Sequence, residues 1–232
     1  LLPPASFDFR QRCGDVVFDI LRRAPRLLAP IVRMYGRRLD QCGATAQGVF
    51  WRDEDWQELR FERLSCIFDP ADTAKGGVSI NDFGCGYGAF FDFLVKQPIM
   101  NDSQYYGYDI VQEMIAACRD RITDPRAKFL RKMWATKTAD YSFACGTYNL
   151  NGNANEDDWR GYVESSLKQL WGKSNKALAF NMLRRDSNDQ YPGLYYIDPE
   201  DMRRFLKKAL SKDVEIFDER PLPDVTYFVR KG

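Results

Sequence analysis

VSINDFGCGYG, residues 78–88, carries the clearest fold signal in this chain. It predicts a buried strand that leads into three alternating glycines and then into the start of an apolar helix. Glycine permits a tight turn and lets a ligand approach the backbone without a Cβ atom in the way. Gly84, Cys85 and Gly86 are therefore the first candidate binding residues.

An acidic residue follows at a spacing that suits a nucleoside. Asp109 lies 21 positions after Gly88 and ends a second predicted strand, Gln104–Asp109. A carboxylate about 20 residues beyond a glycine loop, at the tip of the neighbouring strand, is placed to accept hydrogen bonds from ribose hydroxyl groups. The sequence therefore predicts a nucleotide-type cofactor held by the loop and Asp109.

The charge just before the loop distinguishes two such cofactors. Residues 84–89 also satisfy the dinucleotide pattern Gly-x-Gly-x-x-Ala, in which a helix N-terminus receives a pyrophosphate. Asp82, directly before the glycines, would repel a pyrophosphate and attract an ammonium group. A sulfonium cofactor with an amino-acid end and an adenosine end matches this pattern, with Asp82 near the amino group and Asp109 on the ribose.

From residue 76 to residue 232 strand-like and helical runs alternate, which predicts an α/β domain. Expected strands cover residues 78–83, 104–109, 127–130, 140–145, 176–182, 214–217 and 225–230. Expected helices cover residues 88–96, 111–122 and 156–171, and a last helix starts at Asp198. The final two strands have too short a connection for a crossover helix, so they should pair antiparallel. We expect a doubly wound, mostly parallel seven-stranded sheet with an antiparallel last strand.

Residues 1–75 read as an N-terminal helical extension, a cap on the substrate side of the fold, with its helices broken at Pro25 and Pro30. Residues 10–40 contain eight arginines against three aspartates. Such an excess marks either a solvated helix face or a surface for an anionic partner.

The chain of 232 residues contains no histidine, 34 Lys plus Arg and 33 Asp plus Glu. The lack of histidine excludes a Ser-His-Asp triad, a Cys-His nucleophile, a His-ligated zinc and a histidine base. The six cysteines form no Cys-x-x-Cys pair, so we expect reduced thiols and no metal site. No apolar run approaches the ~20 residues of a membrane span and no signal peptide is visible, so we expect a cytoplasmic protein that does not contact a membrane.

Residues 82–88 resemble the first motif of the class I S-adenosylmethionine-dependent methyltransferases, and Gly107–Ile110 with Met114 resembles their ribose- and adenine-binding segment. Residues 140–149, which include Cys145, resemble the fourth strand and the loop that borders the methyl group. The resemblance covers residues 78–232 and implies a Rossmann-like fold, S-adenosylmethionine as cofactor, and methyl transfer. More loosely, residues 51–64 (Trp51-x5-Gln57-x2-Arg60-Phe61-x2-Leu64) resemble a helix of a poorly characterised bacterial subgroup.

One segment departs from that family. Its members often carry an acid after the third strand that binds the adenine amino group, whereas this chain has Arg131-Lys132-Met133-Trp134. We therefore expect adenine to rely on backbone groups and on packing against Ile110, Met133 or Trp134.

Two residues of the N-terminal extension are further candidates for the cofactor site. Arg60 either binds the cofactor carboxylate as a bidentate fork or forms a surface ion pair with Glu58 or Glu62. Trp51 is either a wall of the adenine or substrate pocket or a core aromatic.

Methyl transfer from a sulfonium is an in-line displacement, so the protein mainly positions donor and acceptor. Ligands of open α/β sheets bind at the carboxyl ends of the strands. Tyr148 and Asn149, after the fourth strand, are therefore predicted to contact the acceptor, and Asn181 and Arg184, at the end of the fifth, to bind substrate. We expect a small-molecule acceptor that is methylated at oxygen or nitrogen.

Three other functions remain open from the sequence. An NAD(P)-linked oxidoreductase fits the glycine pattern, but the only Tyr-x-x-x-Lys, Tyr227 to Lys231, lies in the terminal strand. An RNA methyltransferase could use the arginine-rich segment, yet that segment has no lysine and few aromatics, so we do not expect a nucleic-acid partner. The third is a non-catalytic nucleoside-binding protein with the same fold.

Overall fold

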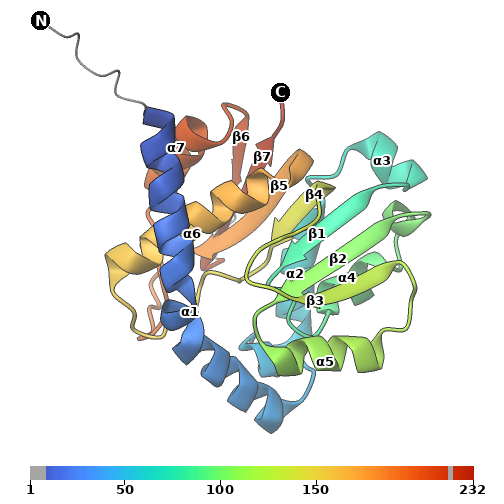
Figure 1. Cartoon of the computed structure of the whole chain (residues 1–232). Helices are drawn as coiled ribbons and strands as arrows, with labels where there is room; N and C mark the ends of the chain where they lie inside the picture. Colours follow the sequence, from blue (N-terminus) through green and yellow to red (C-terminus); the bar gives the residue numbers. More distant parts are fainter. Residues whose placement is uncertain (1–8, 219–221) are drawn as a thin grey trace, which may run out of the picture.

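The computed structural model describes residues 9–218 and 222–232, and for residues 9–22 it describes the backbone alone. Its centre is a seven-stranded sheet in the order β3-β2-β1-β4-β5-β7-β6 (Figure 1). The strands are β1 (Ser79–Phe83), β2 (Gln104–Asp109), β3 (Ala127–Arg131), β4 (Ala139–Ala144), β5 (Ser174–Leu183), β6 (Val214–Phe217) and β7 (Asp224–Arg230). Strands β1 to β5 run parallel, whereas β7 is antiparallel to both β5 and β6. The predicted mixed seven-stranded sheet is thus confirmed.

Helices cover both faces of this sheet (Figure 1). One face packs on α1 (Phe9–Cys42), α6 (Glu156–Trp171) and α7 (Pro199–Ala209). The other face packs on α2 (Glu54–Ser65), α4 (Ala89–Leu94) and α5 (Gln112–Arg121). The short elements η1 (Gln47–Val49), α3 (Pro70–Lys75) and η2 (Pro98–Met100) lie between the longer ones along the chain. The doubly wound arrangement follows from this two-sided cover.

Strand β5 illustrates why the sheet is covered on both sides. Leu178, Phe180 and Met182 belong to the core under α1, α6 and α7, whereas Ala177 and Ala179 belong to the opposite core. Successive side chains of a strand point to opposite faces. A run that is apolar at every position therefore requires a helical layer on each side.

The N-terminal helix differs from the prediction. We expected Pro25 and Pro30 to break it, but both lie inside the continuous α1. A proline in a helix interior costs about 3 kcal/mol through a lost hydrogen bond and a steric clash. The buried side chains of Ala24, Leu28 and Ile31 oppose that cost, because they anchor this part of α1 in the core it shares with α6 and α7.

The segments before residue 76 contribute to both cores. Ala24, Leu28 and Ile31 pack on one face of the sheet, while Phe61 and Leu64 of α2 pack on the other. The N-terminal segment therefore packs on both faces of the sheet.

The surface of the described residues carries several unburied arginines on α1. Arg23, Arg26, Arg33 and Arg37 are exposed, and the side chains of the arginines before residue 23 lie outside the described part.

Among the described residues, none of the helices combines the length and apolar character needed to cross a membrane. Nor do three or more acidic or cysteine side chains of this part come together in a way that could hold a metal ion.

Candidate functional site

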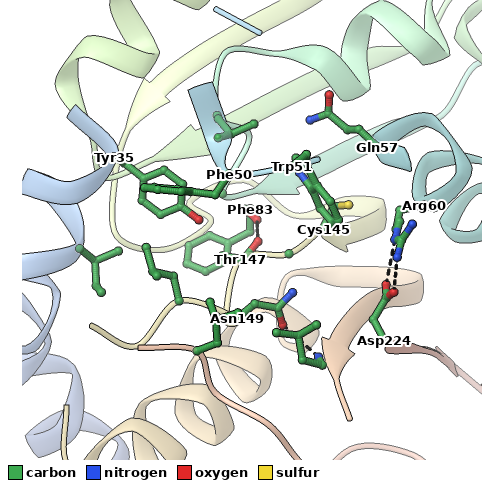
Figure 2. A pocket seen from close by; sticks show the side chains of 18 of the residues that line it. Tyr35, Phe50, Trp51, Gln57, Arg60, Phe83, Cys145, Thr147, Asn149 and Asp224 are labelled. Atoms are coloured by element: carbon green, nitrogen blue, oxygen red, sulfur yellow. Dashed lines mark hydrogen bonds and ion pairs between the residues drawn. The ribbon is translucent and has the colours of Figure 1, made fainter. Parts of the chain in front are cut away.

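A large cavity opens at the carboxyl ends of β1, β2 and β4 (Figure 2). Its volume is about 1010 Å³. The glycine loop forms its floor, together with the ends of β2 and β4. The walls come from α1, from residues 49–61 and from residues 183–196. Segments that are far apart in the sequence thus meet at the edge where ligands of open α/β sheets bind.

The glycine loop has a backbone that requires glycine. Gly84, Gly86 and Gly88 have φ angles of 79°, 55° and 90°, in the left-handed region. A Cβ atom on Gly84 would lie 2.5 Å from the Oγ1 atom of Thr147. That hydroxyl donates a 2.7 Å hydrogen bond to the carbonyl of Phe83, so the loop after β4 is held directly against the end of β1.

Asp109 fixes the shape of the loop from the neighbouring strand. Its carboxylate accepts hydrogen bonds from the backbone N–H groups of Gly86 (2.9 Å) and Val111 (2.8 Å). It therefore connects the glycine loop to the start of α5 while it lines the cavity. Burial raises the pKa of Asp109 to about 6, although the backbone hydrogen bonds favour its ionised form.

Asp82 is the second buried acid of the cavity. Burial raises its pKa to about 7, the hydrogen bond that Tyr105 donates opposes this shift, and the charge of Asp109 adds to it. Two carboxylates in one apolar cavity repel each other when both are ionised. A bound ammonium group next to Asp82 would relieve that cost, so the site favours a ligand with a positive charge there.

Tyr148 and Asn181 occupy positions that differ from the prediction. Tyr148 is fully buried, and its hydroxyl forms a 2.9 Å hydrogen bond with Ser166 in the core under α6. Asn181 is also fully buried, and its Oδ1 atom accepts a 2.7 Å hydrogen bond from the N–H of Gly146. Neither side chain lines the cavity, so neither is placed to contact an acceptor or substrate. Both side chains point into the protein, because the buried Tyr148 hydroxyl and the N–H of Gly146 need hydrogen-bond partners there.

Arg60 is not a surface residue. It is 2% exposed and forms a bidentate pair with Asp224, with distances of 2.6 Å from Nη2 to Oδ1 and 3.3 Å from Nε to Oδ2 (Figure 2). The alternative of a surface pair with Glu58 or Glu62 is therefore wrong. The guanidinium group lines the cavity with its charge already compensated by Asp224.

The adenine side of the site also needs a correction. Ile110 and Met114 line the cavity, as expected for packing residues. Met133 and Trp134 do not, and Trp134 is 39% exposed. The chain turns away after β3, and Lys132 is the residue of this segment that lines the cavity.

The remaining candidates line the cavity. Trp51 lies over the β4 tip, where a Cβ atom on Gly146 would be 2.8 Å from its ring. The thiol of Cys145 is next to it (Figure 2), and burial raises the pKa of that thiol well above its usual value. Asn149 accepts a 3.1 Å hydrogen bond from the N–H of Leu183.

Arg184 lies on the wall of the cavity that residues 183–196 form. It is 3% exposed and paired with Asp186, at 2.5 Å, and with Asp218. The pKa of Arg184 is raised, first by its hydrogen bond to Asp186. Its side chain is therefore held by acids of this chain while it borders the cavity.

Several lining residues were missed by the sequence interpretation. Tyr35 points its hydroxyl into the cavity (Figure 2), and within the described residues this hydroxyl has no hydrogen-bond partner. Apolar side chains of α1 and α6 also line the cavity, namely Leu28, Ile31, Met34, Trp159 and Tyr162. Their helical spacing in the sequence indicates that they are buried. It does not show whether they face a core or a pocket, because both produce the same pattern.

Comparison with known proteins agrees with this geometry. Residues 81–148 match the family model described as a methyltransferase domain. The protein "Putative methyltransferase Rv1506c" of Mycobacterium tuberculosis is 33% identical over 163 residues, which cover 69% of this chain and 97% of that protein.

Two solved structures share the fold. Human N-acetylserotonin methyltransferase in complex with S-adenosylmethionine superposes with a TM-score of 0.62 and 14% identity, over 97% of this chain and 68% of that one. Magnesium protoporphyrin IX methyltransferase of Synechocystis PCC 6803, with bound S-adenosylhomocysteine, gives a TM-score of 0.56 and 13% identity, over 76% and 83% of the two chains.

The residues of the cavity fit S-adenosylmethionine as the cofactor. Asp82, Asp109, Ile110 and Met114 line the cavity. Asp82 would offer a carboxylate for the ammonium group and Asp109 one for the ribose, while Ile110 and Met114 would offer an apolar surface for the adenine. Gly84 and Gly86 leave the backbone open where the ligand must approach. A pyrophosphate would face the buried carboxylate of Asp82, which disfavours the NAD(P) alternative. This chain belongs to the class I S-adenosylmethionine-dependent methyltransferases.

Proposed function

We propose that this methyltransferase acts on an uncharged, largely apolar small molecule and methylates it at an oxygen or nitrogen atom. The observation that carries the proposal is the extent of the cavity, which continues from the glycine loop to the apolar side chains of α1. Its volume of about 1010 Å³ is at the top of the roughly 300–1,000 Å³ range of ligand pockets. An acceptor therefore has room beside the cofactor.

The charges of the cavity support an uncharged acceptor. Asp82 and Asp109 lie at the cofactor end. The two buried guanidinium groups of the described lining, Arg60 and Arg184, are each paired with aspartates. A carboxylate or phosphate group on the acceptor would lose its hydration without gaining an unpaired buried cation.

Tyr35 and Asn149 are our candidates for the polar contacts of the acceptor. Burial raises the pKa of Tyr35, with smaller contributions from Asp109 and Cys145, so its hydroxyl stays protonated and donates. Asn149 uses its Oδ1 atom for the N–H of Leu183, which leaves its amide N–H groups as donors. Both side chains line the cavity, and each can orient an oxygen or nitrogen atom that carries a lone pair.

The chemistry asked of the protein is mainly positioning. S-adenosylmethionine supplies a methyl group on a sulfonium centre, which is already an electrophile. The glycine loop, Asp82 and Asp109 hold the donor, while α1 and residues 183–196 form walls beside the acceptor. Fixing donor and acceptor in line can itself lower the barrier by several kcal/mol.

A labelled methyl group tests the proposal. The protein is incubated with S-adenosylmethionine carrying tritium on its methyl group, and with neutral phenols, alcohols and amines. Benzoates and short RNA serve as comparison acceptors. We expect label in neutral acceptors, whereas label in RNA or in the benzoates alone would contradict the proposal.

Tyr35→Phe is the matched variant for this assay. It keeps the ring, which packs edge-on against Phe50 at 5.3 Å, and removes the hydroxyl alone. We expect kcat/KM for the acceptor to fall roughly 3- to 10-fold, the usual effect of one lost hydrogen bond. Affinity for S-adenosylhomocysteine should not change, and an unchanged kcat/KM would remove Tyr35 from the acceptor site.

A further inference from the structure

A closed set of contacts surrounds the tip of β4, and we call it the tip clamp. Its members are Trp51, Arg60, Gly146, Asn181 and Asp224. They come from the N-terminal segment, from α2, and from the ends of β4, β5 and β7. Figure 2 shows three of them, Trp51, Arg60 and Asp224. Positions 51 and 224 of the chain are thereby joined at one point of the cavity.

The clamp runs through short polar contacts. The N–H of Gly146 donates to Asn181 Oδ1 at 2.7 Å, and Asn181 Nδ2 donates to Asp224 Oδ2 at 2.6 Å. Arg60 donates to both carboxylate oxygens of Asp224, at 2.6 Å and 3.3 Å. Each polar group therefore depends on the orientation of the next.

Stacking completes the clamp. The guanidinium carbon of Arg60 lies 5.5 Å from the centre of the Trp51 ring and 3.9 Å from that of Trp56. Trp51 in turn covers Gly146, where a Cβ atom would be 2.8 Å from the Cζ2 atom of its ring. The fixed fork of Arg60 thus links the position of this indole to the carboxylate of Asp224.

The clamp is not only part of the core, because most of its members also line the cavity. Trp51, Arg60, Gly146 and Asp224 line the cavity, and Asn181 lies directly behind them. Arg60, Asp224 and Asn181 are 2%, 6% and 0% exposed, so the polar chain is nearly dry. In such surroundings a mispaired donor is costly, which makes the arrangement stiff.

We propose that the tip clamp is a positioning device for the cofactor pocket. Asn181 and Asp224 act as positioning residues: they hold the backbone of Gly146 and, through Arg60, the ring of Trp51 at a fixed separation. That separation sets the width of the cavity beside Cys145. Disturbing the clamp at Asn181 or Asp224 therefore changes cofactor affinity through the positions of Gly146 and Trp51.

Asp224→Asn tests the proposal with almost no change of volume. In this variant one amide N–H group must face a donor of Arg60 or Asn181, because all of these groups donate at Asp224. We expect affinity for S-adenosylhomocysteine, measured by calorimetry below the unfolding temperature, to fall at least about tenfold.

The matched control is Ser142→Ala. Ser174 donates a 2.8 Å hydrogen bond to Ser142, and this buried bond joins the same two strands, from the first residue of β5 to the interior of β4. We expect the control to lower thermal stability but to leave S-adenosylhomocysteine affinity within about twofold. Equal effects of the two variants on affinity, or no effect of Asp224→Asn, would overturn the proposal.

A second pair of variants decides the matter if Asp224→Asn does not fold. Gly146→Ala disturbs the contact between Gly146 and Trp51, because the added Cβ atom displaces the Trp51 ring. Trp51→Phe removes the outer ring atoms that this Cβ atom meets. We expect Gly146→Ala to weaken S-adenosylhomocysteine binding and the double variant to recover part of it. If the double variant binds no better than Gly146→Ala, the proposal is wrong.

Discussion

The hydroxyl of Tyr105 donates a hydrogen bond to the carboxylate of Asp82 at the base of the cofactor pocket. Both groups are buried, at 0% and 2% exposure, on adjacent strands of the sheet. Burial alone would hold this carboxyl in its neutral form, and the phenol is the group that opposes this shift. The pair therefore sets the pH at which the site accepts a cation.

Cofactor binding should depend on pH through this pair. Asp82, with a pKa of about 7, must ionise to pair with the ammonium group, so affinity for S-adenosylhomocysteine should fall as the pH drops through about 7. Tyr105→Phe removes the hydrogen bond that lowers this pKa, so the midpoint should move to higher pH. Calorimetric titrations between about pH 5.5 and 8.5 measure both midpoints. Coincident midpoints would show that Tyr105 does not tune the site.

The stability of the ligand-free protein should fall as the pH rises. Asp82 and Asp109 have pKa values of about 7 and about 6, above their ordinary value of 3.8. Between 3.8 and these values the folded protein binds more protons than the unfolded chain, so the free energy of unfolding decreases with pH across this window. Denaturant unfolding at several pH values checks the slope. Asp82→Asn should flatten the slope, and an equally steep slope in this variant would contradict the assignment.

The glycine loop should tolerate no side chain at Gly84. Gly84→Ala places a Cβ atom 2.5 Å from Thr147 at a φ angle of 79°. We expect a loss of about 1–3 kcal/mol in the free energy of unfolding, together with loss of S-adenosylhomocysteine binding. Gly36→Ala, in the interior of α1, places its Cβ atom at an ordinary contact distance of 4.0 Å from Glu113 Oε2 and should instead stabilise by about 0.5–1 kcal/mol. Chemical denaturation of both variants separates the two effects.

Asp109 should contribute to cofactor affinity directly. Asp109→Ala leaves the N–H groups of Gly86 and Val111 without their acceptor and removes the expected ribose contact. We expect S-adenosylhomocysteine affinity to fall by about 1–3 kcal/mol, the cost of buried groups left unpaired. Calorimetry with NADH in place of S-adenosylhomocysteine is the companion measurement. NADH binding as tight as that of the sulfur nucleoside would argue against the role of Asp82 in excluding pyrophosphate.

The cofactor half of the site was predictable because its information is local. Asp82, Gly84 and Gly86 are neighbours in the chain, and Asp109 follows at the end of the next strand. A strand that leads into a glycine turn and a helix places these groups by short-range geometry. The alternation of strands and helices likewise predicts the sheet, since period-2 and helical patterns are read within short windows.

The acceptor half was not predictable in the same way. Tyr148 and Asn181 stand at strand ends, where a ligand contact was expected, yet both turn into the core and partner Ser166 and Gly146. Tyr35, which does reach the cavity, lies on a helical stripe that reads as ordinary core. At a strand end the direction of a side chain depends on which partners the neighbouring layers offer.

The sheet, the glycine loop, its two acids and the kind of cofactor they suit follow from the amino-acid sequence alone. The pairing of Arg60 with Asp224, 164 positions away, and the cavity wall formed by α1, a helix that continues through two prolines, become apparent only in the folded chain. The two groups of features differ in the range of the interactions that produce them. Turn and strand geometry is fixed by adjacent residues, whereas buried charges find their partners only once the layers have packed.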